Sequence, residues 1–413
     1  MPRIDSDSCP VLRGPRGATG DPRFAALDEV VRRGLGTGPE ALYPGAVLVV
    51  AHRGTVVHAA AHGDAQYLTL DRRGEIGQLS VPRRMAVRTI FDVASMTKVM
   101  ATTGAAMRLV DSGMLGLDDR LGELLPEFAN GDKSAITIRQ LLTHRAGLWE
   151  WQPAWRHLDS EGRTLAWLAA LPLRYPVGAR FAYSDIGFML LGEIVARVAG
   201  LALDHYARRE IFDPLGMADT GFLPAHNLRR RMAATSRGDQ YQQRMGETGR
   251  PWPIVRDPPL QPFSNYRTHF LLGEANDLNV WAGWGGVAGH AGLFSTALEV
   301  ARFAQLMLNG GCYGRHRLIS PQTVARFLET PYDPIQALGF RKLQLGKGGV
   351  AFYGHPGFTG TMFNFAPELG LTVVFLTNRV HRAGTETTEY PSLDLIREAL
   401  LRHAVEAVGP SSG

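Results

Sequence analysis

Runs of apolar residues that are typical of buried strands lie near both ends of this chain. Residues 46–51 and 55–60 are two such runs joined by a turn at Gly54, and they predict a hairpin. Three further runs, separated by short turns, lie at 350–353, 361–365 and 371–377. The sequence therefore predicts an α+β fold in which both ends contribute to one antiparallel sheet flanked by helices, with an all-α lobe inserted between them.

The spacing of apolar residues elsewhere is typical of helices. Helical patterns occur at 95–109, 138–142, 186–198 and 297–308, and near the ends at 22–35 and 392–407. We expect an α/β lobe made of residues 21–92 and 290–413, and a helical lobe made of residues 93–289. Within the helical lobe, residues 225–285 are polar and rich in Pro and Gly, which predicts a long loop that binds a ligand, acts as a lid or is disordered.

Two other segments carry little hydrophobic pattern. The composition of residues 1–20, with few residues to bury, predicts a disordered tail. Residues 63–86 are polar and irregular. The two cysteines, Cys9 and Cys312, have no nearby partner in the sequence, so we expect neither a disulfide framework nor a metal cluster.

The composition is that of an ordinary globular protein, with 45% apolar and 20% charged residues. The net charge of +5 comes from Arg, since the chain has only four Lys. Because the Arg residues are scattered, with the densest run at 229–231, we expect no nucleic-acid partner. No stretch reaches about 18 uninterrupted apolar residues, so we expect no contact with a membrane. The first 20 residues lack the apolar core of a secretory signal, which favours a cytoplasmic protein.

The first chemically informative motif is Ser95-Met96-Thr97-Lys98. On a helix, residues three apart share a face, so the Ser95 hydroxyl and the Lys98 amine can meet. A Ser hydroxyl is a weak nucleophile until a neighbour takes its proton, and a Lys amine can do so if its surroundings lower its pKa. This motif alone also fits an ordinary helix start.

The second motif is Tyr183-Ser184-Asp185. A Tyr183 phenol near Lys98 could relay the Ser95 proton, and Asp185 could position Lys98 or a substrate amide. The other interpretation is a helix N-cap, which Ser and Asp both favour.

The third motif, His355-Pro356-Gly357, lies between two predicted strands. Glycine lets a substrate approach the backbone closely, and His355 could hydrogen-bond the acyl group or relay a proton. A tight turn with a structural histidine is the alternative.

In this order, the three motifs resemble those of the serine β-lactamase and penicillin-binding-protein superfamily, in its class C-like branch with esterases and D-aminopeptidases. That family carries S-x-x-K, then Y-x-N or S-D-N, then K-T-G or H-x-G. Residues 141–148 and 289–296 also resemble its L-L-T-H-T-S-G-L and G-G-L-F-S-T segments. The resemblance covers most of the chain and implies an α/β lobe and an all-α lobe with the site between them.

The resemblance also implies roles. Ser95 is the expected nucleophile, and Lys98 and Tyr183 act together as base and acid, with the first proton acceptor left open. The amides of Ser95 and Phe358 are the expected oxyanion hole. His355 takes the place of the lysine in the third motif.

Two departures from the family pattern bear on the substrate. Asp185 stands where Asn is usual, which removes an amide donor toward a β-lactam side chain. His355-Pro356 replaces Lys-Thr, which removes a cation and a hydroxyl that bind a carboxylate; Gly357 is retained. Both changes argue against an efficient β-lactamase and against a cell-wall peptidase.

The expected activity is hydrolysis of an ester or amide of a small molecule through a Ser95 acyl-enzyme. One alternative is a transacylase that passes the acyl group to an amine or alcohol, and another is an inactive binding protein of the same fold. His290, Trp284 and Trp149 are candidate pocket residues. No metal-ligand pattern is visible, so we expect no metal and no other cofactor. The expected partner is a small-molecule acyl donor, and the oligomeric state stays open.

Overall fold

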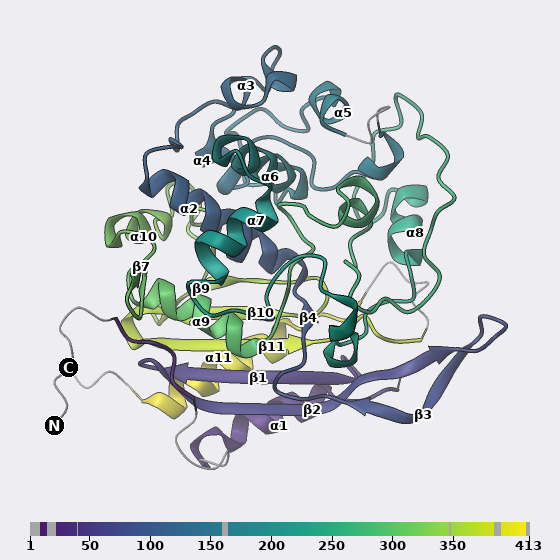
Figure 1. The fold of residues 1–413 in the computed structure, drawn as a ribbon, viewed down its shortest axis with the longest axis vertical. Coiled ribbons are helices and arrows are strands. Elements are labelled where there is room, and N and C mark those ends of the chain that lie inside the picture. Colours follow the sequence, from purple (N-terminus) through teal and green to yellow (C-terminus); the bar gives the residue numbers. More distant parts are fainter. Residues whose placement is uncertain are drawn as a thin grey trace.

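The computed structural model describes residues 9–14, 22–38, 40–158, 164–346, 348–383 and 390–409. Its centre is a seven-stranded antiparallel sheet in the order β3-β2-β1-β11-β10-β9-β8 (Figure 1). The strands are β1 (Gly45–His52), β2 (Thr55–Leu70), β3 (Ile76–Arg84), β8 (Arg341–Gln344), β9 (Ala351–Pro356), β10 (Met362–Ala366) and β11 (Leu371–Thr377). Since β1 pairs along its length with β11, the predicted α+β fold with both ends in one sheet is confirmed.

Two pairs of short strands lie outside this sheet. β4 (Phe91–Asp92) pairs with β5 (Phe294–Ser295), and β6 (Cys312–Tyr313) pairs with β7 (His316–Arg317). The pairing of β4 with β5 matters for the site, because β4 leads directly to Ser95.

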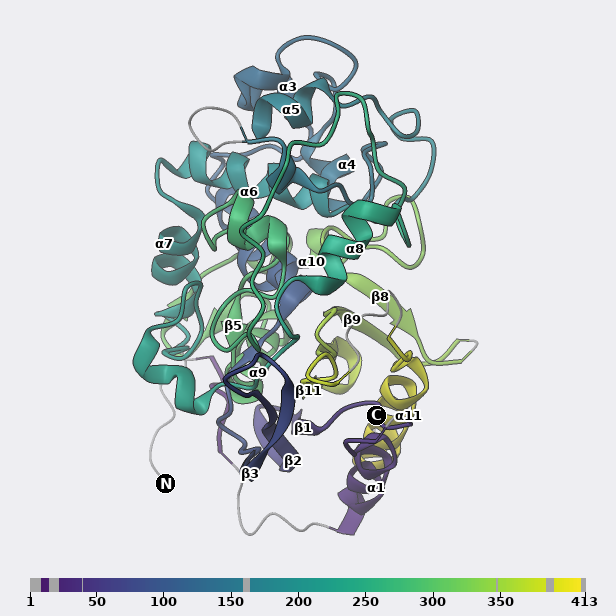
Figure 2. The same cartoon turned by 90° about the vertical axis from the view of Figure 1, so that its right-hand side faces the viewer.

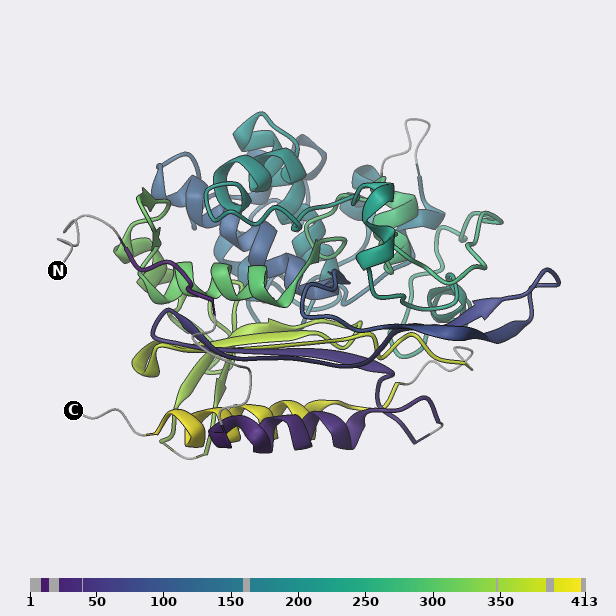
Figure 3. The same cartoon turned by 60° about the horizontal axis from the view of Figure 1, so that its bottom comes forward.

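Helices cover both faces of the sheet, which Figure 3 shows edge-on. α1 and α11 lie together on one face, whereas α9 packs against β10 and β11 on the other. Most other helices form a lobe above that second face (Figure 2). The helices are α1 (Ala25–Gly34), α2 (Gly104–Asp111), α3 (Leu121–Leu124), α4 (Ile138–Leu142), α5 (Leu165–Ala170), α6 (Asp185–Ala199), α7 (Leu203–Ala207), α8 (Gln240–Thr248), α9 (Ala297–Leu308), α10 (Pro321–Phe327) and α11 (Asp394–Val408). Among the described helices none alone is long and apolar enough to cross a membrane; α6 and the stretch Leu203–Phe212 pass that test only as a pair bent by 73°.

Alternate residues of β1 contribute to two separate cores. Val47 and Val49 belong to the core shared with the helical lobe, whereas Leu48 and Val50 belong to the core beneath α1 and α11. Successive side chains of a strand point to opposite faces, so a strand buried on both sides reads as a continuous apolar run. The uninterrupted run at 46–51 is explained by this arrangement.

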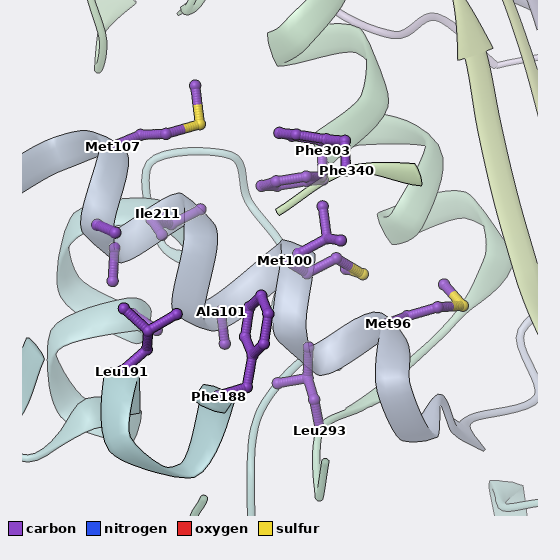
Figure 4. Packing of buried hydrophobic residues seen from close by; sticks show 14 of the residues in the cluster. Met96, Met100, Ala101, Met107, Phe188, Leu191, Ile211, Leu293, Phe303 and Phe340 are labelled. Carbon is purple, nitrogen blue, oxygen red and sulfur yellow. The ribbon is translucent and has the colours of Figure 1, made fainter. Parts of the chain in front are cut away.

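The helical stretch that follows Ser95 is buried in the larger core. It consists of short turns at Ala94–Met96 and Lys98–Thr103 and then α2. Figure 4 shows Met100 and Ala101 from this stretch beside Phe188 of α6 and Phe303 of α9, all fully buried. Close packing of this kind leaves a helix little freedom to shift, so the start of the stretch is held firmly.

Residues 63–86, which the sequence analysis treats as irregular, are largely strand. β2 continues to Leu70 and pairs with β3, and the two extend as a ribbon beyond the body of the molecule (Figure 1). The side chains of β3 are exposed or half-buried. A strand without a buried face lacks the alternation of apolar and polar residues on which the prediction depends.

The cysteines contradict the sequence-based expectation. Cys9 and Cys312 form a disulfide whose Cα atoms lie 5.8 Å apart, although the two residues are separated by 303 positions. Arg13 forms a bridge with the start of β2, so residues 9–14 are ordered and the prediction of a disordered tail is wrong for them. The remaining residues of that tail lie outside the described residues.

Candidate active site

Ser95 lies on a strained turn at the start of the buried helical stretch. Ala94 adopts a φ of 46°, a left-handed conformation that is costly for a residue other than glycine. Asp92 holds the turn, because its Oδ1 accepts a hydrogen bond of 2.8 Å from the Ala94 amide. Burial raises the pKa of Asp92 to about 6. The turn presents Ser95 at a helix start, where backbone amides favour developing negative charge.

Lys98 is fully buried, and oxygen atoms surround its ammonium group. Its Nζ lies 3.0 Å from Ser95 Oγ, 2.9 Å from the His290 carbonyl oxygen and 2.7 Å from Asp185 Oδ1. The same atom lies 5.0 Å from the centroid of the Tyr183 ring. The predicted contact between Ser95 and Lys98 is therefore present, and Asp185 adds an ion pair to it.

Asp185 favours the protonated form of the Lys98 amine. Burial favours the neutral amine, but the Asp185 carboxylate, together with the hydrogen-bonding Tyr183 side chain, outweighs burial and raises the pKa of Lys98 above its ordinary value. Burial also raises the pKa of Tyr183, and Lys98 opposes this effect only in part. The expectation that the surroundings lower the pKa of Lys98 is therefore wrong: the resting pair is an ammonium and a neutral phenol.

The second motif lies at the start of α6, where it both caps the helix and places side chains beside Lys98. The Ser184 side chain caps α6 by accepting a hydrogen bond from a backbone amide of its first turn. The flanking Tyr183 and Asp185 face Lys98, and the Tyr183 hydroxyl is within hydrogen-bonding reach of Lys98 and the nucleophile. His144 packs against the Tyr183 ring with centroids 4.6 Å apart, and its Nδ1 accepts the Ser184 amide at 3.0 Å.

His355 lies behind Tyr183, with ring centroids 5.9 Å apart. Its Nδ1 is 2.6 Å from the Pro356 carbonyl oxygen. Burial and the charge of Lys98 lower the pKa of His355 to about 3, so this histidine is neutral. The third motif therefore supplies no cation for a substrate carboxylate.

Gly357 allows the third motif to contact the nucleophile turn. A Cβ at this position would lie 2.5 Å from the Val93 carbonyl oxygen and 2.1 Å from Thr361 Oγ1. No side chain fits there without moving the turn after β9. Phe358, the next residue, lies on the wall of the cavity beside Ser95. The oxyanion hole formed by the Ser95 and Phe358 amides stays a prediction, with both residues at one cavity.

A cavity of about 200 Å³, here called the Ser95 cavity, opens at the nucleophile. The 225–285 loop supplies much of its wall, through Tyr241, Gln242, Met245, Trp252, Asn276 and Asp277. The sequence left three roles open for this loop: ligand binding, a lid or disorder. Its position on the cavity wall favours ligand binding. Its only α-helix is α8, which explains the weak periodicity of the segment.

Asp92, Trp151 and the polar residues of the loop are wall residues that the sequence analysis did not identify. A signal existed for Asp92, since an acidic residue in the run just before Ser95 is unusual for a buried strand. Asn276 and Asp277 carry no comparable signal, because they reach the cavity only through the path of an irregular loop.

Of the three predicted pocket residues, only His290 lines the Ser95 cavity. The indole N–H of Trp284 donates to Glu193 at 2.8 Å, and that of Trp149 donates to the Pro172 carbonyl at 2.8 Å. Neither tryptophan is among the residues that line the Ser95 cavity, although the Trp284 ring lies 6.3 Å from that of His290. In the part of the chain that the structure describes, no group of three or more His, Cys, Asp or Glu is arranged to hold a metal ion.

The sequences of curated relatives align with most of this chain. N-acetylmuramyl-L-alanine amidase of Bacillus subtilis is 34% identical over 395 residues, which cover 90% of this chain and 84% of the relative. A putative D-alanyl-D-alanine carboxypeptidase of Escherichia coli is 32% identical over 376 residues, which cover 85% of this chain and 82% of the relative.

Solved structures share the fold at lower identity. A penicillin-binding protein homologue from Caulobacter crescentus has a TM-score of 0.67 and 23% identity, covering 95% of this chain and 99% of that one. EstCE1, described as a hydrolase with promiscuous acyltransferase activity, has a TM-score of 0.64 and 23% identity, and the match covers 93% of this chain and 100% of EstCE1. The model of the Beta-lactamase family matches residues 27–397. Since this match spans nearly the whole chain and includes all three motifs, the chain is a serine hydrolase of the Beta-lactamase family.

Proposed function

We propose that this hydrolase cleaves an amide of a small molecule through an acyl-enzyme on Ser95. The observation that carries the proposal is the 3.0 Å contact between Lys98 Nζ and Ser95 Oγ at the edge of a cavity. A hydroxyl so close to a group that can exchange protons is the arrangement that nucleophilic catalysis requires.

In the first step the Ser95 oxygen bonds to the substrate carbonyl carbon while its proton passes to the Lys98–Tyr183 pair. The tetrahedral intermediate then expels the amine, which takes a proton from that pair, and the acyl group stays on Ser95. Water repeats the sequence and frees the acid product. Because Asp185 holds Lys98 as an ammonium, the pair must lose a proton before it can accept one, so we expect the rate to rise with pH.

The amide that we propose first is N-acetylmuramyl-L-alanine. It is the bond named for the Bacillus subtilis relative, which aligns with 90% of this chain. The neutral His355 disfavours substrates that the third motif must bind by a carboxylate, such as β-lactams and the carboxyl-terminal D-alanine named for the other relative. We expect slow or absent hydrolysis of the β-lactam nitrocefin. Rapid turnover of nitrocefin would contradict the inference that a neutral His355 disfavours substrates with a carboxylate.

A fluorophosphonate probe followed by intact-mass spectrometry tests the covalent mechanism. We expect one adduct on the wild type, none on Ser95→Ala, and wild-type labelling on Ser112→Ala, since Ser112 is an exposed serine at the end of α2. Release of L-alanine from N-acetylmuramyl-L-alanine is measured on the same samples. An unlabelled wild type, or an undiminished adduct on Ser95→Ala, would favour the inactive binding protein.

Transfer of the acyl group to an amine or alcohol would use the same acyl-enzyme. Adding hydroxylamine at millimolar concentration during turnover separates the two outcomes. We expect the free acid to remain the main product. Predominant formation of the hydroxamate, at an unchanged rate of substrate loss, would identify a transacylase.

We also propose that the protein works in an oxidising compartment rather than in the cytoplasm. The Cys9–Cys312 disulfide supports this proposal, because disulfides persist in such compartments and are rare in the cytosol. Maleimide labelling of protein from the producing cells tests it, with labelling expected only after reduction.

A further inference from the structure

The turn between β9 and β10, here called the 357–361 turn, is anchored to the segment that precedes the nucleophile. Thr359 Oγ1 donates to the Asp92 carbonyl at 2.7 Å, and Thr361 Oγ1 donates to the Val93 carbonyl at 3.1 Å. These contacts hold the turn through its side chains. The direction of its peptide groups has to be set by other contacts.

Arg397 of α11 bonds the backbone of this turn from the side opposite to the catalytic site. α11 lies on the face of the sheet away from the helical lobe (Figure 3). Arg397 Nη2 donates to the Gly357 carbonyl at 3.4 Å and to the Thr361 carbonyl at 3.1 Å. The Gly357 carbonyl also accepts the Gly360 amide at 3.1 Å. Arg397 lines a separate cavity of about 280 Å³, which shares none of its described residues with the Ser95 cavity.

The direction of the Gly357 carbonyl determines the direction of the Phe358 N–H. Both groups belong to one planar trans peptide, in which the carbonyl and the N–H point in opposite directions. The carbonyl is directed to Arg397 on the α11 side, so the N–H is directed to the other side, where Phe358 lines the Ser95 cavity. This is the direction that a donor to an oxyanion requires.

Arg379 fixes the next peptide of the turn. Its Nε donates to the Phe358 carbonyl at 2.8 Å, and its guanidinium lies 5.5 Å from the centroid of the Phe358 ring. The peptides on both sides of the Phe358 Cα are therefore held by arginines from different elements, Arg397 in α11 and Arg379 just after β11. Together they leave the Phe358 N–H little freedom to rotate away from the cavity.

The charge of Arg397 also acts on this amide. The Arg397 side chain is 15% exposed, and its one ion-pair partner among the described residues, Asp394, is 84% exposed and 3.4 Å away. Burial and the charge of Arg379 lower the pKa of Arg397 to about 10, so the guanidinium is a buried cation at neutral pH. Such a cation is costly unless it is well bonded. A cation at a carbonyl oxygen polarises the whole peptide and makes its N–H a stronger donor.

We propose that Arg397 is a positioning residue for acylation, because it directs and polarises the Phe358 amide toward the oxyanion that forms when Ser95 attacks. Arg379 assists by fixing the next peptide. This inference rests on the proposed acyl-enzyme mechanism. As the bond from Ser95 to the carbonyl carbon forms, the second electron pair of the C=O bond moves onto the oxygen, and the amide N–H stabilises that charge. Arg397 does not line the Ser95 cavity, so it acts only through the peptide between Gly357 and Phe358.

Two esters that differ in one atom test this role. p-Nitrophenyl acetate and p-nitrophenyl thionoacetate have the same leaving group, but the second carries sulfur where the oxyanion forms. Because sulfur accepts hydrogen bonds weakly, the ratio of kcat/KM for the oxygen ester to that for the sulfur ester reports on the oxyanion contacts. Arg397→Gln is expected to lower kcat/KM for the oxygen ester about 10–100-fold and the ratio about tenfold. An unchanged ratio would overturn the positioning role.

Arg108→Gln is the matched control. Like Arg397, Arg108 donates to a backbone carbonyl, that of Leu318, and its buried Nε has no hydrogen-bond partner among the described residues. This variant is expected to leave the oxygen-to-sulfur ratio unchanged, even if it lowers stability. A similar fall of the ratio in Arg108→Gln would identify a general structural effect and overturn the role of Arg397.

Chemical rescue tests the same role in a second variant whose folding is checked by circular dichroism. Arg397→Ala enlarges the cavity beside α11, so guanidinium ion at millimolar concentration can take the place of the side chain. We expect guanidinium to restore part of the ratio, and tetramethylammonium, a cation without N–H donors, to restore none. Equal restoration by both cations would overturn the hydrogen-bonding role.

Fluorophosphonate labelling of Ser95 in the same samples separates this inference from the proposed function. A labelled wild type, together with an unchanged ratio in the Arg397 variants, overturns the positioning role and leaves the hydrolase intact. An unlabelled wild type overturns the hydrolase. A labelled wild type with a lowered ratio in both Arg397 variants supports both proposals.

Discussion

Asp185 is the residue at which this site departs most clearly from the Asn of the family pattern. Its carboxylate raises the pKa of both Lys98 and Tyr183, so it favours the protonated state of the pair that must accept the Ser95 proton. In the proposed mechanism the base therefore becomes available only as the pH rises.

Asp185→Asn should therefore move the rising limb of the pH–rate profile to lower pH. Removing the negative charge lowers the pKa of both neighbours, and we expect a shift of about 1–3 pH units in kcat/KM against pH. Asp213→Asn, at an exposed position, should leave the profile in place. A limb that stays fixed or moves to higher pH would show that this pair does not control the rate.

Gly357→Ala should disable the site while leaving its catalytic side chains unchanged. The added Cβ would meet the Val93 carbonyl oxygen at 2.5 Å, so the turn carrying Phe358 has to move. We expect kcat/KM to fall about 100-fold and the free energy of unfolding to fall by about 1–3 kcal/mol.

The matched control is Gly77→Ala, since a Cβ at Gly77 in β3 meets no atom within 4 Å. Urea unfolding and steady-state rates should both stay near the wild type for this variant. An active Gly357→Ala enzyme would mean that the turn can shift without cost.

The contact between Ser95 and Lys98 could be predicted from the sequence better than the electrostatics around it. Ser95 and Lys98 are three positions apart on one helix, so local geometry brings them together. The ion pair of Lys98 with Asp185, which reverses the expected direction of the Lys98 pKa, depends on the packing of α6. Trp149 was misplaced for a similar reason, because nearness to a motif says nothing about the direction of a side chain.

Among the elements, the buried helical stretch after Ser95 holds the nucleophile in place. α6 and α9 pack around it (Figure 4), and the hydroxyl of Thr102 donates to the Gly289 carbonyl at 2.7 Å. The stretch therefore links the nucleophile to both lobes, and cavities in its core should affect stability more than chemistry.

Met100→Ala should destabilise the protein by about 2–5 kcal/mol, the usual cost of removing a fully buried methionine side chain. Urea unfolding followed by circular dichroism measures this change. Met114→Ala is the control, because Met114 is 56% exposed and its loss should change stability by less than about 0.5 kcal/mol. Similar values for both variants would mean that the helix can close the cavity.

Helices and buried strands were predictable wherever a buried face imposes a period on the sequence. The strands at 351–356, 362–366 and 371–377 follow the apolar runs closely. β3 was missed because none of its own side chains is fully buried, so its pairing with β2 rather than its own pattern determines the structure.

On the scale of the whole molecule, the Cys9–Cys312 disulfide fastens the start of the chain to β6. Because its partners are 303 positions apart in the sequence, their spacing did not indicate the bond. A crosslink across so long a loop restricts the unfolded chain strongly.

Cys9→Ser/Cys312→Ser should lower the free energy of unfolding by roughly 2–4 kcal/mol, measured as a lower Tm without loss of kcat. A reducing agent should lower the Tm of the wild type to that of the double variant and leave the variant unaffected. Equal Tm values for the oxidised wild type and the double variant would show that the crosslink adds no stability.

The pairing of β1 with β11 has a consequence for the order in which a growing chain becomes an enzyme. Ser95 and Lys98 leave the ribosome before the turn with Gly357 and Phe358 and before the central strand β11. Until then β1 lacks its neighbour on one side, and the nucleophile lacks the turn that packs against it. A nascent chain that has not yet released β11 and this turn therefore lacks part of the structure that surrounds Ser95.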